Sequence, residues 1–147
     1  MFIQKNYNPK GENKPDCLIR ALTAYHGSTK TYNSIKAELV KIGKIIGYPY
    51  NSDSTIIMYC KKHNLKIYVS NDKRDHYMIR LSERYNAENV VIKTKNKRIN
   101  VNNFCKYNHG KAVVCSSTHA IYVENKNHID THDSGRRFVT YVIRKSD

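Results

Sequence analysis

A cysteine stands at the predicted first turn of a helix near the N-terminus of this 147-residue chain. Residues 15–22 read PDCLIRAL, in which two helix-start residues precede Cys17 and apolar residues follow at helical spacing. A helix N-terminus carries about half a positive charge and unpaired N–H groups. Both favour a thiolate over a thiol, and the thiolate is the nucleophile. The segment therefore predicts a reactive cysteine.

A histidine stands much later in the chain, at the start of an apolar segment that alternates like a strand. Residues 118–123 read THAIYV, and Asp130 and Asp133 follow beyond a turn. Histidine titrates near neutral pH and can take the proton of a thiol. A carboxylate behind the ring fixes its tautomer and supports its positive charge. Cys17, His119 and one of these aspartates could therefore perform nucleophilic catalysis together.

The register of the C-terminal hairpin decides which aspartate lies behind the histidine. If the turn centres on Lys126, His119 faces Asp133 across the two strands. Asp130 is then displaced by three residues and points to the other face, because side chains alternate along a strand. We predict Asp133 as the residue that orients His119 and keep Asp130 as the alternative.

The elements that position these residues are predicted to be helices first and strands later. Capping residues, apolar spacing and following glycines predict helices over 16–26, over 31–44, and from 52–54 to 61–63. Strand-like patterns occupy 65–69, 111–116, 118–124 with 128–131, and 137–144, and a short helix is predicted over 100–107. Residues 70–98 offer short candidate elements at 77–81 and 90–93. We therefore predict one α+β domain over 1–147, with N-terminal helices packed on a C-terminal antiparallel β-sheet.

The composition constrains the compartment and the partners. The chain has a net charge of +14, and residues 61–111 hold thirteen Lys or Arg against four Asp or Glu. This excess favours an acidic partner, although a Lys- and Asn-rich surface from an AT-biased genome gives the same composition. We rank nucleic acid below protein as a partner, because no nucleic-acid-binding motif accompanies the charge. Without a secretory or membrane-spanning apolar run, we expect a cytoplasmic protein whose four cysteines are free thiols and which has no membrane partner.

The two ends of the chain resemble small papain-like cysteine peptidases of bacteriophage and low-GC bacterial genomes. Residues 16–22 (DCLIRAL) are similar to a DCxxRAL helix start, and residues 118–134 are similar to a GHAxxV…DTxDS hairpin. The resemblance implies a papain-like fold with Cys17 as nucleophile, His119 as base and Asp133 as orienting residue. It also implies a protein or peptide substrate and, for a phage-encoded protein, a location in the host cytoplasm.

One departure from this family concerns the donor that stabilises the oxyanion. Papain-like enzymes carry a glutamine several residues before the cysteine, whereas residues 11–14 here read GENK. Asn13 is our candidate for the missing amide, beside the backbone N–H of Cys17. The same apparatus also serves deamidases and transferases, and the sequence does not choose between these and a hydrolase.

Non-enzymatic functions and metal binding are the alternatives. The same scaffold could serve as an inhibitor or interaction protein for an acidic partner, or tyrosines among lysines could stack on nucleic acid. Zinc sites need closely spaced ligand pairs, and the available pairs are Cys60 with His63 and Cys105 with His109. The hairpin histidines, His128 and His132, could form a surface metal patch with the two aspartates. We expect no metal and no cofactor, and leave the oligomeric state open.

Overall fold

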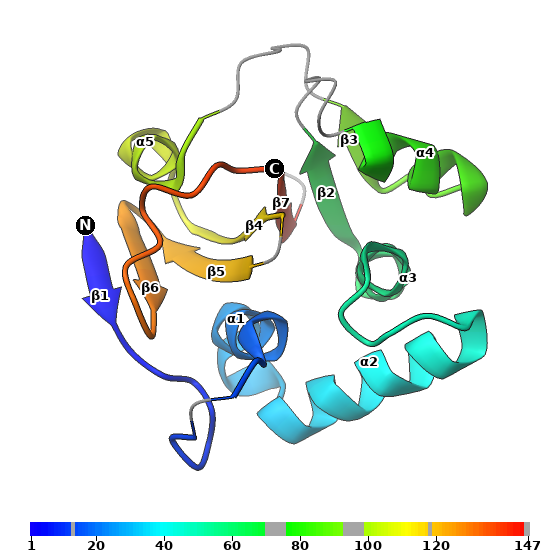
Figure 1. Ribbon diagram of the computed structural model, residues 1–147, viewed down its shortest axis with the longest axis horizontal. Helices are drawn as coiled ribbons and strands as arrows, with labels where there is room; N and C mark the ends of the chain where they lie inside the picture. The colour runs from blue at the N-terminus through cyan, green and yellow to red at the C-terminus, as the bar shows by residue number, and fades with distance from the viewer. Residues whose placement is uncertain (13, 70–75, 93–98, 118, 146–147) are drawn as a thin grey trace.

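The computed structural model describes residues 1–12, 14–69, 76–92, 99–117 and 119–145, and Figure 1 shows their arrangement. Within these residues there are five α-helices and one seven-stranded mixed sheet, so the α+β class is confirmed. The helices are α1 (Cys17–His26), α2 (Tyr32–Ile46), α3 (Asp53–Lys62), α4 (His76–Arg84) and α5 (Val101–Tyr107). The strands are β1 (Phe2–Gln4), β2 (Leu65–Val69), β3 (Val90–Ile92), β4 (Lys111–Ser116), β5 (His119–Glu124), β6 (Asn127–Asp130) and β7 (Tyr141–Lys145).

The N-terminal helices begin where their capping residues predict. The side chain of Thr31 accepts a hydrogen bond from the backbone N–H of Ser34, which completes a capping box at the start of α2. Ser52 caps α3 in the same way, through the N–H of Thr55. Gly47 ends α2 with a φ of 78°, a left-handed conformation that glycine adopts without steric cost. Local sequence signals therefore account for these boundaries.

The sheet departs from the predicted antiparallel arrangement at both ends. Its strand order is β1-β6-β5-β4-β7-β2-β3, and the pairs β1–β6 and β2–β3 are parallel. The N-terminal segment adds β1 to the edge of the hairpin, with Ile3 beside Ile129. The middle of the chain adds β3 through the crossover helix α4, which a parallel connection requires. The prediction of a wholly antiparallel, C-terminal sheet is therefore wrong.

Both faces of the sheet are covered. Helices α1 and α3 pack on one face with α2 packed against both of them from outside, and α5 lies on the other face (Figure 1). On β4, Val113 and Cys115 point into the core under α1 to α3, whereas Ala112 and Val114 point toward α5. Coverage on both faces explains why β4 reads as a continuous apolar run instead of an alternating one.

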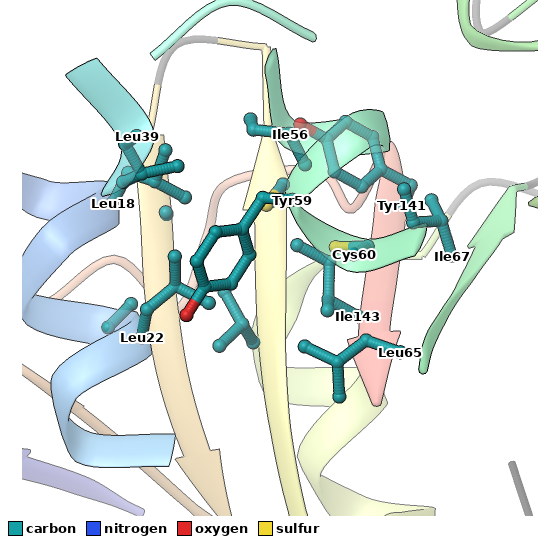
Figure 2. Packing of buried hydrophobic residues seen from close by; sticks show 14 of the residues in the cluster. Leu18, Leu22, Leu39, Ile56, Tyr59, Cys60, Leu65, Ile67, Tyr141 and Ile143 are labelled. Atoms are coloured by element: carbon teal, nitrogen blue, oxygen red, sulfur yellow. The ribbon is translucent and has the colours of Figure 1, made fainter. Parts of the chain in front are cut away.

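The larger core lies between the sheet and the first three helices, and Figure 2 shows it from close by. Its labelled members are Leu18, Leu22, Leu39, Ile56, Tyr59, Cys60, Leu65, Ile67, Tyr141 and Ile143. Burying an aliphatic or aromatic side chain of this size contributes about 1.5–3 kcal/mol. Packing within this core keeps α1 in contact with β5 and β4.

Among the described residues, no helix has both the length and the apolar character needed to cross a bilayer.

Candidate active site

Cys17 is the first residue of α1 and is half-buried against the sheet. The carbonyl of Asp16 accepts the first helical hydrogen bond, from the N–H of Arg20, at 3.0 Å. The backbone N–H groups of the first turn have no acceptor within the helix. The predicted placement of Cys17 at a helix N-terminus is confirmed.

His119 begins β5 and pairs with Ser116 at the end of β4. This end of the sheet lies at the N-terminus of α1, so Cys17 and His119 line the same pocket, of about 260 Å³. The thiol and the imidazole are hydrogen-bonded to each other, and the backbone N–H of Ala120 also donates to the sulfur. A nucleophile and a base from distant parts of the chain are thus in contact.

The carboxylate behind His119 is Asp130. The distance from Nε2 of His119 to Oδ2 of Asp130 is 2.5 Å. Asp133 instead accepts a hydrogen bond from Nε2 of His128, at 3.0 Å, and is exposed. Our prediction that hairpin register puts Asp133 behind His119 is therefore wrong, and the alternative, Asp130, holds that position.

A shorter turn than the predicted one explains this exchange. Glu124 pairs with Asn127, and Tyr122 pairs with Ile129, so the turn contains two residues and not three. Shortening a turn by one residue moves every side chain of the second strand to the opposite face. Asp130 thereby comes to the same face as His119, as its diagonal neighbour across the strand pair.

Further hydrogen bonds fix the orientation of the Asp130 carboxylate. Its Oδ1 accepts from the backbone N–H of Thr131 at 2.7 Å, and its Oδ2 accepts from the hydroxyl of Ser134 at 2.9 Å. Asp130 and Ser134 are both buried. Ser134 was not among the predicted site residues, because its role depends on how the chain folds back after β6.

The pKa shifts of Cys17 and His119 favour an ion pair. Burial acts to raise the pKa of Cys17, but the hydrogen bonds from His119 and Ala120 and the positive charges of His119 and Arg20 outweigh it, and the pKa is lowered. Burial acts to lower the pKa of His119, yet its hydrogen bonds to Asp130 and Cys17 raise it to about 9. Both shifts therefore favour the ion pair of thiolate and imidazolium over the neutral thiol and imidazole.

A buried network lies directly behind Cys17. Arg20 Nε is 2.8 Å from Asp16 Oδ1, and Asp16 Oδ2 accepts hydrogen bonds from Tyr32 OH at 2.5 Å and from Asn8 Nδ2 at 2.9 Å. Asp16 and Arg20 are separated by the helical i, i+4 spacing, which brings their side chains together. The network anchors the start of α1 to the N-terminal segment and to α2.

Glu38 belongs to a different cluster. It pairs with His63 at 2.7 Å and with Lys62 at 3.1 Å, both at the end of α3. This cluster joins α2 to α3 and does not line the pocket around Cys17.

Several polar side chains that the sequence did not single out face the candidate nucleophile. Asn51, just before α3, lines the pocket with Cys17, together with Ser116 and Ser117 at the end of β4. Asn13, our predicted oxyanion donor, lies outside the described residues. Among the described residues that line the pocket, Asn51 is therefore the one with an amide side chain. No local sequence pattern predicts this position, because Asn51 reaches the site through the packing of α3.

The structure also bears on metal binding. Ligand atoms of His119, Asp130 and His132 all lie within 4.8 Å of one another, the one such group among the described residues. The zinc pairs considered from sequence do not form a group of this kind there, and Cys60 and Cys105 are buried in the two cores. A metal ion bound at His119 would take the place of the proton that His119 shares with Asp130.

Comparisons of this chain with protein-family models, with curated proteins and with solved structures find no match. The function is accordingly inferred from the geometry and chemistry of the site itself.

Proposed function

We propose that the protein is a papain-like cysteine hydrolase that cleaves a peptide, isopeptide or amide bond. The observation that carries this proposal is the connected row of Cys17, His119 and Asp130, in which a thiol, an imidazole and a buried carboxylate are linked by hydrogen bonds. Their order along the chain, with cysteine on a helix and the other two on neighbouring strands, is the order of papain-like enzymes. The described helices and strands form the layers that hold these three residues in place.

The reaction begins with the ion pair. The thiolate of Cys17 attacks the carbonyl carbon of the substrate and forms a tetrahedral intermediate. His119 then gives its proton to the leaving amine, the C–N bond breaks and a thioester remains. A water molecule, deprotonated by His119, attacks the thioester carbon, and the carboxylic acid leaves as the thiolate and the imidazolium are restored.

Asp130 serves this reaction by orienting His119. It holds Nε2 at 2.5 Å, so Nδ1 is the ring nitrogen left to contact Cys17. Its negative charge stabilises the imidazolium, and its own position is fixed by Ser134 and Thr131. The residue therefore acts through His119 and is a positioning residue.

The oxyanion of the tetrahedral intermediate needs hydrogen-bond donors aimed at the attacked carbonyl oxygen. The backbone N–H of Cys17, at the start of α1, is one candidate. The amide of Asn51 is the second, because it lines the same pocket. Together these donors would do the work of the glutamine that papain-like enzymes carry and this chain lacks at the usual spacing.

Brief alkylation with iodoacetamide, followed by peptide mapping, tests the nucleophile. Cys17 should be labelled much faster than the other three thiols, whose pKa burial raises. Cys60, with no exposed surface, is the matched internal control. Equal labelling of all four cysteines would contradict an activated thiol.

Turnover is tested separately, with a proteome-derived peptide library and mass spectrometry of new termini. We expect cleavage or deamidation products with the native protein and with Cys60→Ala, and none with Cys17→Ala. Fast labelling of Cys17 without any product would show a reactive site that does not hydrolyse amides, and would overturn the hydrolase proposal in favour of an interaction protein on this scaffold.

A further inference from the structure

The pocket at Cys17 continues into a second pocket, of about 210 Å³, that reaches α4. The two pockets share four lining residues, which are Asp53, Ser116, Ser117 and Tyr141. The second pocket extends the lining to Tyr77 and Met78. The two therefore form one groove, which starts at the candidate nucleophile and passes Asp53 midway.

Asp53 gives this groove a charge opposite to that of the molecule. The chain carries a net charge of +14, yet no lysine or arginine is among the described residues that line either pocket. Besides Cys17 and His119, one side chain in that described lining ordinarily ionises near or below neutral pH, and it is the carboxylate of Asp53. A cationic group that enters the groove therefore meets the Asp53 carboxylate, and the positive side chain in the described lining, His119, is already paired with the Cys17 thiolate.

One oxygen of the Asp53 carboxylate is hydrogen-bonded, and the other is available to a ligand. The hydroxyl of Tyr141 donates to Oδ1 at 3.0 Å, whereas Oδ2 accepts no hydrogen bond from the described residues. Burial raises the pKa of Asp53, and the hydrogen bond from Tyr141 opposes that rise. A cation paired with Oδ2 would offset the same cost of burial. Ile56 and Met78 supply apolar surface beside the carboxylate.

We propose that this groove binds a lysine or arginine side chain of the substrate next to the bond under attack, and that Asp53 determines this specificity by pairing with its charge. The proposal rests on the proposed function, because it names the substrate class of the same site. Lysine and arginine fit both features of the groove, since each joins an apolar stem to a cationic head. The apolar walls would contact the stem and Asp53 the head.

Charged thiol reagents test the proposal without a known substrate. Methanethiosulfonates transfer their thioalkyl group to the Cys17 thiolate, which forms a mixed disulfide and releases methanesulfinate. We would measure the second-order rates of the trimethylammonioethyl reagent, the sulfonatoethyl reagent and the uncharged methyl reagent at Cys17 by mass spectrometry. The ratio of the cationic to the anionic rate reports the local charge of the groove.

Asp53→Asn should reduce this ratio by about tenfold, the scale expected when one charge near the sulfur is removed. The asparagine keeps an acceptor for Tyr141, so the fold should be retained, and the thermal midpoint checks this. Glu88→Gln makes the same change of charge at an exposed position and should leave the ratio unchanged. A ratio that is equal in native protein and Asp53→Asn would overturn the subsite.

The uncharged reagent separates the two proposals. If it reacts rapidly with Cys17 while the charge ratio does not respond to Asp53, the nucleophile stands and the subsite is wrong. If it reacts no faster with Cys17 than with the buried Cys60, the proposed function fails, and the ratio still reports whether Asp53 selects cations. In the peptide library, cut sites should be enriched in lysine or arginine beside the scissile bond, and Asp53→Asn should lose that enrichment.

Discussion

Nε2 of His119 and Oδ2 of Asp130 lie 2.5 Å apart, at the end of the sheet where α1 begins. This contact commits one ring nitrogen to the carboxylate and leaves the other for Cys17. The two residues share a face of the β5–β6 pair because the turn between these strands is one residue shorter than its sequence suggests. The orientation of the imidazole thus depends on the register of one hairpin.

Asp130→Asn should lower turnover far more than Asp133→Asn. The asparagine keeps the shape of the side chain but removes the charge that supports the imidazolium, and in serine triads the corresponding change costs about 10⁴-fold. The loss here should be smaller, roughly 10²-fold, because the thiol of Cys17 already has a lowered pKa. Asp133→Asn is the matched control, since its partner is His128. Equal losses in kcat/KM from both variants would exclude the orienting role of Asp130.

The pH dependence of turnover should have two limbs. The acid limb should lie below the ordinary pKa of a thiol, because the pKa of Cys17 is lowered, and the alkaline limb should lie near the His119 pKa of about 9. Since the folded-state pKa of His119 is raised, the stability it contributes is complete below its ordinary pKa and is lost as pH rises through about 9.

The rate of Cys17 alkylation by iodoacetamide should show the acid limb alone, because the thiolate persists at high pH. His119→Asn should move that limb toward the ordinary thiol pKa and slow alkylation below neutral pH, because less of the thiol is then ionised. An acid limb at the ordinary thiol pKa in the native protein would be evidence against the ion pair.

Asn51→Ala should separate oxyanion stabilisation from nucleophile activation. Loss of one oxyanion donor typically costs about 10²–10³-fold in kcat, and we expect the lower end because Asn51 is exposed. Iodoacetamide alkylation of Cys17 forms no oxyanion, so its rate should stay unchanged. A parallel decrease in both rates would show that Asn51 acts on the thiol or on the fold instead.

Zinc should inhibit both turnover and Cys17 alkylation. His119, Asp130 and His132 offer ligand atoms within 4.8 Å of one another, and zinc binding there would remove the proton that supports the ion pair. Inhibition should weaken as pH falls and should be reversed by a chelator. His132→Ala should weaken zinc inhibition by at least about tenfold, which is the low end of what even the outer partners of metal ligands contribute. Unchanged zinc sensitivity in this variant would rule out the three-ligand site.

Asp16→Ala should destabilise the fold strongly. Asp16 and Arg20 are 5% and 8% exposed, and removing one partner of a buried ion pair costs about 3–5 kcal/mol. The free energy of unfolding in urea measures this loss. Glu12→Ala, which breaks the exposed pair with Lys14, is the control and should change little. A loss under 1 kcal/mol for Asp16→Ala would mean that the network does not anchor α1.

Short-range signals in the sequence were sufficient for the helices that carry the site. The start of α1 at Cys17, the caps at Thr31 and Ser52 and the apolar spacing between them depend on residues within one or two turns of each other. Capping hydrogen bonds and steric preferences between such near neighbours depend little on how the rest of the chain folds. The sequence therefore determined the α+β class, and it identified Cys17 and His119 as the pair to examine.

The register of the β5–β6 hairpin could not be predicted from such short-range signals. Both faces of β5 are apolar, so Ile129 could join either core, and the hydrophobic pattern does not choose between the two registers. The choice is made by a distant segment. The backbone N–H of Asn125 donates to Gly110 O at 2.8 Å, and its side chain accepts from the Gly110 N–H at 3.0 Å. Asn125 is thereby held with a φ of 54° in the short turn.

Contacts between distant segments also decided the rest of the site. Asn51 and Asp53 reach the groove through the packing of α3. Strands β1 and β3 pair in parallel with their neighbours, a pairing that no local pattern predicts. Such contacts depend on which surfaces meet once the chain is compact, and many sequences with the same local signals would meet differently. The sequence by itself determined the nucleophile and its helix, while the tertiary structure decided which carboxylate, which amide and which charge surround it.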